Sequence, residues 1–281
     1  MARTLPGTSR GVLDARTARD RFHVTRIAPS PELARFVEYL WVLTWDLRGR
    51  PPHRQRVLTR PSVHMTFTSY LTTGATRARI VGVVRDEFVE EIAGEGRVVG
   101  AAFRPGGFRP FLGAPVSAIT GRTPAVAEVF GPAGRRLGGE IFGTPDADGA
   151  VARLEAFLLG RCPPAPDPRA LRAAEIVERI AASPALTRVD DLAADLGIGP
   201  RGLQRLFQEY VGVGPKWVIR RHRMLEAAER AAAGTEIGWA ALAAELGYAD
   251  QAHFTRDFTA SVGTSPARYA RRQHAPPDRP A

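Results

Sequence analysis

Residues 239–269, WAALAAELGYADQAHFTRDFTASVGTSPARY, decide the fold of the second half of this chain. Their first part carries apolar side chains at positions i, i+3, i+4 and i+7, which is the spacing of one buried helix face. These side chains are Trp239, Leu242, Ala243 and Leu246. Gly247 ends that helix, and Phe254 and Phe258 give a following helix a buried face of its own. The stretch therefore predicts two short helices joined by a tight glycine turn.

Polar side chains lie between the buried positions of the second predicted helix and are left on its outward face. They are Gln251, His253, Thr255 and Arg256. Two short helices with a tight turn form the helix-turn-helix arrangement, in which one helix enters the major groove of DNA. Ordinary helical hairpins share this pattern. The stretch alone therefore leaves both interpretations open.

The same pattern occurs fifty residues earlier in the chain. Val189, Leu192, Ala193, Leu196, Gly197 and Ile198 correspond to Trp239, Leu242, Ala243, Leu246, Gly247 and Tyr248. After one inserted residue, Leu203, Arg205, Phe207, Gly212 and Pro215 correspond to Phe254, Arg256, Phe258, Gly263 and Pro266. Chance hairpins do not repeat a turn glycine, a core and an exit proline in order. Residues 215–233 between the copies contain no helix breaker, so the sequence predicts two helix-turn-helix units on one linker helix.

Length and composition indicate two domains. With 281 residues, of which 44% are hydrophobic, the chain can bury two cores. A single cysteine, Cys162, excludes a disulfide framework and a cysteine-rich zinc site. No apolar run reaches about 18 residues, and the N-terminal segment lacks the apolar core of a signal peptide. We therefore expect a cytoplasmic, nucleoid-associated protein that neither crosses a membrane nor is secreted.

The net charge of +10 is typical of proteins that bind nucleic acids, but the distribution of this charge along the chain does not support DNA binding by the C-terminal domain. Residues 170–281 hold 15 Lys and Arg against 13 Asp and Glu, so most of the excess lies in the first 169 residues. The global charge assists non-specific attraction to phosphate. An argument for DNA binding must therefore rest on where individual side chains lie.

The first part of the chain opens with a polar segment. Residues 1–25 are rich in arginine and lack periodicity, and we expect a disordered basic arm there. Ser30 and Pro31 then mark a helix start, and apolar residues continue at helical spacing from Leu33 to Leu40.

From about residue 41 to residue 108 the hydrophobic period changes to two. The change is clearest where Val63, Met65 and Phe67 alternate with His64, Thr66 and Thr68. Further strands are expected at 56–59, 78–84 and 97–103, and helices at 124–130 and 149–159. The pattern predicts an α+β domain over residues 26–160, with a small antiparallel sheet or barrel and helices closing its end.

A Pro-rich segment, residues 161–168, is the best linker in the chain. It separates the α+β domain from an all-α domain at residues 169–273, in which the linker helix joins the two helix-turn-helix units. Residues 274–281 are expected to form a disordered tail. Cys162 lies in the linker without a CxxC partner, which favours an incidental residue over a reactive thiol.

Over residues 171–272 the chain resembles the AraC/XylS family of bacterial transcription regulators. Six short motifs carry the resemblance: Leu203-x-Arg205-x-Phe207, Gly212-x-Gly214-Pro215, Arg223-Met224-x-x-Ala227, Leu242-Ala243-x-x-x-Gly247-Tyr248, Asp250-x-x-x-Phe254-x-Arg256-x-Phe258 and Gly263-x-Ser265-Pro266-x-x-Tyr269. In that family, two units on a linker helix insert their recognition helices into successive major grooves on one face of the duplex. The resemblance implies the same geometry here.

By this resemblance the first recognition helix, residues 200–209, presents three side chains to the bases, and the second presents four. They are Arg201, Gln204 and Arg205 in the first, and Gln251, His253, Thr255 and Arg256 in the second. Arginine can bond bidentately to guanine and glutamine to adenine, each pair worth about 1–3 kcal/mol of discrimination. Ion pairs within the domain or phosphate contacts are an alternative role for Arg205 and Arg256, which recur in both copies.

Basic residues near the two units are candidates for phosphate contacts. They are Arg220, Arg221, Arg268, Arg271 and Arg272, although a solvated surface explains them equally well. Thr259 and Ala260 stand where family members often carry basic residues. The phosphate contacts after the second recognition helix are therefore expected to be weaker than in those members.

The N-terminal domain resembles, more weakly, an uncharacterised module that precedes this DNA-binding domain in some family members. The resemblance rests on the segment at 33–41 and on Gly100-x-x-Phe103-x-Pro105-Gly106. By family logic the module senses a small ligand or mediates dimerisation. Candidates for an effector pocket are Trp41, Trp45, His64 and Arg104, with a core or turn role as the alternative for each. No metal-ligand spacing and no nucleophile motif occurs, so we expect no metal, no cofactor and no enzymatic activity.

These observations predict a sequence-specific DNA-binding transcription regulator, controlled by a small ligand or by dimerisation through its N-terminal domain. Double-stranded DNA is the expected partner, and a small-molecule effector, RNA polymerase and a second copy of the chain are further candidates. Two alternatives remain open. One is a small-molecule-binding or enzymatic α+β domain with a helical interaction domain, and the other is a weakly specific architectural DNA binder.

Overall fold

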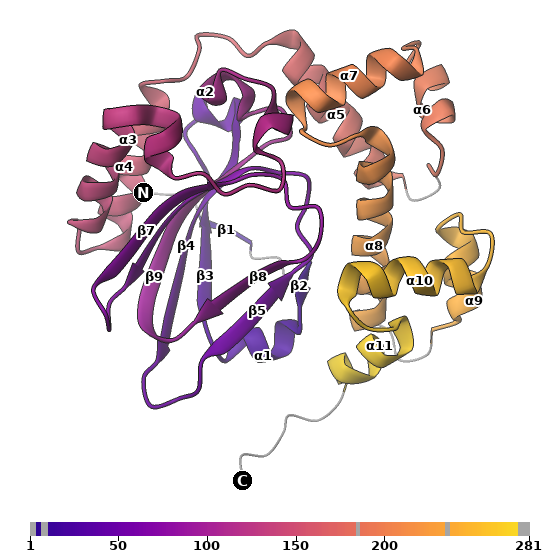
Figure 1. Ribbon diagram of the computed structural model, residues 1–281, viewed down its shortest axis with the longest axis horizontal. Coiled ribbons are helices and arrows are strands. Elements are labelled where there is room, and N and C mark those ends of the chain that lie inside the picture. Colours follow the sequence, from indigo (N-terminus) through magenta and orange to yellow (C-terminus); the bar gives the residue numbers. More distant parts are fainter. Residues whose placement is uncertain (1–3, 7–10, 184–185, 234–236, 275–281) are drawn as a thin grey trace.

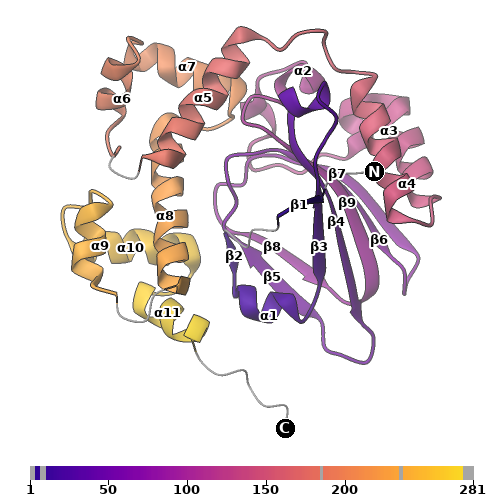
Figure 2. The same ribbon diagram turned by 180° about the vertical axis from the view of Figure 1, so that it is seen from behind.

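The computed structural model describes residues 4–6, 11–183, 186–233 and 237–274. A β-rich N-terminal part lies beside a helical C-terminal part (Figures 1 and 2). The predicted combination of an α+β domain and an all-α domain is confirmed. The predicted C-terminal tail falls outside the described residues, apart from His274, which ends the last helix.

Six antiparallel strands form the larger sheet, in the order β1-β3-β4-β9-β6-β7. They are β1 (Thr4–Leu5), β3 (His23–Ile27), β4 (Val37–Leu47), β9 (Gly94–Phe103), β6 (His64–Tyr70) and β7 (Ala75–Val81). The helices α3 (Val126–Phe142) and α4 (Ala147–Leu159) cover one face of this sheet (Figure 2). Met65 and Phe67 point to that face and are buried, as the alternation in the sequence predicts.

Three strands form a smaller antiparallel sheet in the order β2-β5-β8. They are β2 (Val12–Leu13), β5 (His53–Val57) and β8 (Phe88–Ile92), with the short helix α1 (Ala15–Arg19) following β2. Residues of both sheets line a cavity, to which β6 contributes its other face through His64, Thr66 and Thr68. The connection from β9 to α3 holds two short turns of helix, α2 (Arg109–Leu112) and η2 (Val116–Ile119).

Two expectations for the N-terminal part are wrong. The described residues of the expected arm form β1, β2, α1 and the start of β3, because its few apolar side chains are buried; Leu13 is 1% exposed. The helix expected from Leu33 to Leu40 is only a 3-10 turn, η1 (Leu33–Arg35), and β4 begins at Val37. The run from Val37 is rich in β-branched and aromatic residues, which favour a strand over the helical spacing.

The C-terminal part consists of seven helices in the described residues. They are α5 (Pro168–Ala182), α6 (Val189–Asp195), α7 (Pro200–Tyr210), α8 (Pro215–Ala233), α9 (Trp239–Glu245), α10 (Gln251–Val262) and α11 (Pro266–His274). The pairs α6–α7 and α9–α10 are the two copies of the repeat. Gly197 and Gly247 turn each pair with φ of 61° and 69°, a conformation that favours glycine.

The two helix pairs share their cores with the N-terminal part. Side chains of the first pair, such as Leu203 and Phe207, belong to the same buried cluster as the larger sheet. The second pair packs around Phe254 and Phe258 in a cluster that also contains Leu13 and Leu58 from the N-terminal part. The helical part is therefore docked on the β-rich part at both of its units.

Candidate nucleic-acid interface

The first helix-turn-helix unit holds α7 by its apolar face. Leu203, Leu206 and Phe207 are buried against the rest of the unit, and Pro200 occupies the first turn, where its missing N–H is not needed. The predicted residues Arg201, Gln204 and Arg205 lie on the opposite face, and all three are exposed. The amphipathic sequence of α7 thus fixes which side chains face away from the protein.

The second unit holds α10 in the same way. Asp250 caps the helix, because its side chain accepts a hydrogen bond of 2.7 Å from the backbone N–H of His253. Phe254 and Phe258 are fully buried. The predicted residues Gln251, His253 and Arg256 are exposed, and Thr255 is half-buried.

Helix α8 separates the two recognition helices, with α7 beside its upper end and α10 beside its lower part (Figure 1). Its 19 residues span about 28 Å at a rise of about 1.5 Å per residue. One turn of B-DNA is about 34 Å long, so the linker helix is of similar length to one turn.

Four of the five predicted phosphate contacts are exposed, and one is not. Arg268, Arg271 and Arg272 lie exposed on α11, and exposed Arg220 pairs with Asp257 at 3.0 Å. The fifth residue, Arg221, is buried, so its prediction as a phosphate contact is wrong.

Arg221 is 5% exposed and lies beneath the N-terminal part. Its guanidinium donates hydrogen bonds to the backbone carbonyls of Arg85 and Asp86, the second at 3.0 Å, and lies 4.6 Å from the centre of the Trp217 ring. Burial lowers the pKa of Arg221 to about 10, so it stays charged at neutral pH. It connects the two parts of the protein and does not face a DNA backbone.

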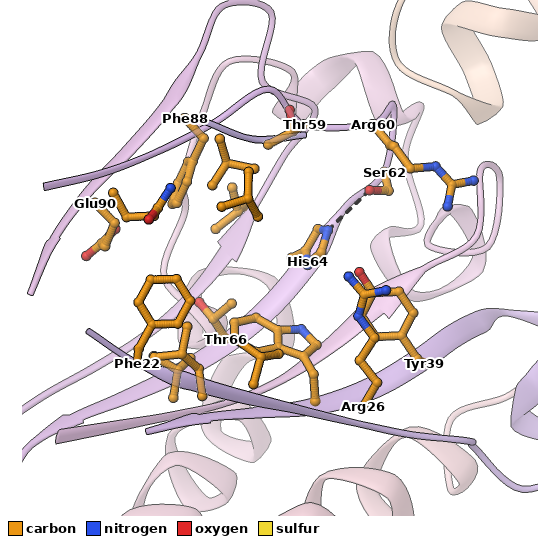
Figure 3. Close-up of a pocket in the computed structure, with 18 of the residues that line it drawn as sticks. Phe22, Arg26, Tyr39, Thr59, Arg60, Ser62, His64, Thr66, Phe88 and Glu90 are labelled. Atoms are coloured by element: carbon orange, nitrogen blue, oxygen red, sulfur yellow. Dashed lines mark hydrogen bonds between the residues drawn. The ribbon is translucent and has the colours of Figure 1, made fainter. Parts of the chain in front are cut away.

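Two of the four predicted pocket residues, Trp41 and His64, line the cavity between the sheets. Figure 3 shows His64 among the residues of this cavity. Its volume is about 530 Å³. Trp45 and Arg104 do not line it. The Trp45 indole N–H donates to the Ala93 carbonyl at 3.1 Å, and Arg104 donates to the Ala34 carbonyl at 2.8 Å, so both have structural roles.

The described residues contain no group of three His, Cys, Asp or Glu side chains that could hold a metal ion. None of the described helices is long and apolar enough to span a membrane.

Comparison with known families identifies the C-terminal region of the chain. Residues 192–272 match a family described as a helix-turn-helix domain. The C-terminal region is an AraC-type helix-turn-helix domain. Residues 25–124 match a domain of unknown function, DUF6597. The AraC-type domain supports a DNA-binding transcription regulator.

The solved structures that are similar to the chain include the following two. The C-terminal domain of AraT, a response regulator from Geobacillus stearothermophilus, is 24% identical; the match covers 41% of this chain and 93% of that one, with a TM-score of 0.35. ToxT from Vibrio cholerae O395 is 13% identical; the match covers 80% of this chain and 98% of that one, with a TM-score of 0.38. No curated protein matches this chain. Because both TM-scores are low, the helix-turn-helix match carries the identification.

The N-terminal part contacts the C-terminal end of the first recognition helix of the AraC-type domain. Arg109 donates to the Glu209 carboxylate at 2.6 Å, and the Thr120 hydroxyl donates to the Gly212 carbonyl at 2.7 Å. No sequence pattern signals these contacts, because the partners are 100 and 92 residues apart in the chain.

The second recognition helix of the AraC-type domain has a matching contact. The Arg56 guanidinium donates to the Val262 carbonyl at the end of α10, and also pairs with Glu87 at 2.5 Å. Gly263 follows with φ of 77°, and a Cβ atom there would lie 2.6 Å from Arg56 Nη2. The positive φ favours glycine at this position, and the end of the Arg56 side chain lies close beside it. Both recognition helices are thus fastened at their C-terminal ends to the β-rich part.

Proposed function

We propose that this protein is a sequence-specific DNA-binding transcription regulator that places α7 and α10 in successive major grooves. One observation carries the proposal. Two copies of the same helix pair, on one rigid helix, each leave a polar face exposed on the equivalent helix. A hairpin with only a structural role has no need to repeat such a face.

We assign base contacts to the exposed polar side chains and backbone contacts to α11. Arg201 and Gln204 on α7, and Gln251 on α10, have the donor and acceptor geometry that reads guanine or adenine. Arg205 and Arg256 occupy equivalent exposed positions and form no ion pair with another described residue, which favours contacts with DNA over pairs within the domain. Arg271 and Arg272 are assigned to phosphates.

The first prediction separates base contacts from phosphate contacts. Gln251→Ala is expected to relax the sequence preference at one or two base pairs, with a loss of about 1–3 kcal/mol on the preferred site only. Arg272→Ala is expected to weaken all sequences equally and to reduce the salt slope of binding by about one. Binding titrations on a preferred site and on single-base variants of it measure both effects. Identical behaviour of the two variants contradicts the assignment.

We further propose that a small molecule in the cavity controls DNA binding through β5. Side chains alternate along this strand, so Gln55 and Val57 line the cavity while Arg56 points away from it to α10. A ligand that moves β5 therefore also moves the contact at Val262. This supports a direct route from the cavity to the second recognition helix.

The second prediction tests this route. A thermal-shift screen on the full chain is expected to find small molecules that stabilise the protein, and these are expected to change its affinity for DNA by at least about threefold. Arg56→Leu removes the contact with α10 and also the ion pair with Glu87, a residue that does not line the cavity. It is therefore expected to keep the thermal shift and to lose the change in affinity. Exposed Arg54, two residues earlier on β5, gives the control Arg54→Leu, which is expected to behave like the unaltered protein.

The route is contradicted if Arg56→Leu retains the full change in DNA affinity. A screen without any stabilising molecule, together with a stable dimer in solution, contradicts ligand control and supports dimerisation as the role of the N-terminal domain.

A further inference from the structure

The walls of the cavity are mostly apolar and aromatic. Phe22, Trp41 and Phe88 line it from three different strands or their ends, beside aliphatic side chains such as Leu43 and Val57. Figure 3 shows Phe22 and Phe88 at this wall. A volume of about 530 Å³ lies within the range of small-molecule pockets. The shape and lining therefore suit a compact molecule with at least one ring.

The charged side chains of the lining are already engaged by the protein. Those among the described residues are Arg26, Glu38, Arg60, Arg79 and Glu90. Arg60 pairs with Glu38 at 2.7 Å, and Arg79 with Glu90 at 2.5 Å. Arg26 lies 4.6 Å from the centre of the Tyr39 ring, stacked on its face. A charged ligand would have to compete with these interactions.

His64 adds no charge to the cavity. Burial lowers its pKa to about 4, so the ring is neutral at physiological pH. Its Nε2 lies 3.2 Å from the Ser62 hydroxyl, which is the hydrogen bond drawn in Figure 3.

Two neutral groups in the lining have no partner among the described protein groups. The indole N–H of Trp41 and the hydroxyl of Thr59 are buried, and no described group bonds to either. A buried donor without an acceptor costs about 1–3 kcal/mol, which a ligand with an acceptor recovers.

Gly100 fixes the indole in this position. It pairs with Trp41 across β4 and β9, and a Cβ atom at residue 100 would lie 2.6 Å from the indole carbon Cε2. The ring therefore packs closely over the glycine, which restricts its position. The glycine of the motif Gly100-x-x-Phe103-x-Pro105-Gly106 thus leaves the space that the Trp41 indole occupies.

We propose that the cavity binds an uncharged, mainly aromatic molecule whose carbonyl or similar oxygen accepts the hydrogen bond of the Trp41 indole. This inference rests on the proposed ligand control of the regulator, for which it names the class of effector. It assigns Trp41 as the residue that orients the ligand, with Thr59 as a second polar contact.

Four biphenyls of similar shape test the class by calorimetric titration of the full chain: 4-acetylbiphenyl, biphenyl-4-carboxylate, 4-(aminomethyl)biphenyl and 4-ethylbiphenyl. The ketone is expected to bind at least about tenfold more tightly than the anion and the cation. Trp41→Phe keeps an aromatic ring but removes the N–H. It is expected to weaken the ketone about two- to tenfold, the worth of one hydrogen bond, and to leave 4-ethylbiphenyl unchanged.

The comparison of the four molecules on the unaltered protein stands even if Trp41→Phe fails to fold. Tighter binding of the carboxylate or the amine overturns the class but leaves ligand control in place. Equal weakening of the ketone and 4-ethylbiphenyl by Trp41→Phe overturns the role of Trp41. Failure of all four to bind overturns this inference, whereas DNA binding of the same preparation tests the DNA-binding part of the proposed function separately.

Discussion

Replacing Phe254 with alanine is expected to lower the free energy of unfolding by about 3–5 kcal/mol and to abolish specific DNA binding. Phe254 is fully buried at the centre of the second unit. Its ring centre lies 5.5 Å from that of Tyr248, 5.8 Å from that of Phe258 and 6.4 Å from that of Trp239. The substitution leaves a cavity between α9 and α10, so α10 loses the surface that orients its polar face.

Urea unfolding and binding titrations on a preferred site measure the two effects of Phe254→Ala. Thr259→Ala, on the exposed face of the same helix, is the control and is expected to change stability by no more than about 0.5 kcal/mol. Unchanged affinity and stability in Phe254→Ala would show that α10 is neither held by this cluster nor needed for binding.

Replacing Arg221 with alanine is expected to lower the free energy of unfolding by about 2–4 kcal/mol. The substitution leaves the carbonyls of Arg85 and Asp86 without their charged donor, and each such hydrogen bond is worth about 1.5–3 kcal/mol. It also removes the guanidinium that stacks on Trp217. Without these contacts the loop at residues 85–86 is expected to detach from α8. Faster hydrogen exchange of the backbone amides in the loop and in α8 would measure this detachment.

The neighbouring Arg220 provides a matched control for Arg221→Ala. Arg220 is exposed and its partner Asp257 is half-buried, and ion pairs at the surface contribute about 0–1 kcal/mol. Arg220→Ala is therefore expected to have little effect on stability. An Arg221→Ala variant of normal stability whose salt slope of DNA binding falls by about one would instead identify Arg221 as a phosphate contact.

Local patterns predicted the helical half of the fold well. The spacing of the apolar residues within each helix depends only on neighbours along that helix. The buried positions of Leu242 and Phe254, and of Leu192 and Leu203, could therefore be predicted without knowing the tertiary structure. The segment after Leu33 was ambiguous for the same reason. Its apolar residues fit a helical period, but pairing with β9, which lies about sixty residues later, makes it a strand.

Long-range contacts decided what the sequence could not predict. Leu13 looks like part of a polar arm until it packs with the core of the second unit, more than two hundred residues away. Arg221 looks like a phosphate contact until the carbonyls 135 and 136 residues earlier are placed beside it. Trp41 and Trp45 share a face of β4, yet only Trp41 reaches the cavity, because Trp45 packs with Leu47 and Ile92.

The shared cores also determine how the protein should be tested. Leu13 and Leu58 contribute to the core of the second unit, so a fragment of the helical domain alone would expose apolar surface and lose part of that core. Experiments on DNA binding therefore require the full chain.

Competition binding with the full chain tests the central claim most directly. A preferred site is first selected from random duplexes, and its affinity at physiological salt is then compared with that of a scrambled duplex of the same composition. Two recognition helices in successive grooves predict a preference of at least about a thousandfold for the selected site. Equal affinity for both duplexes would contradict sequence-specific binding and would favour a weakly specific architectural role.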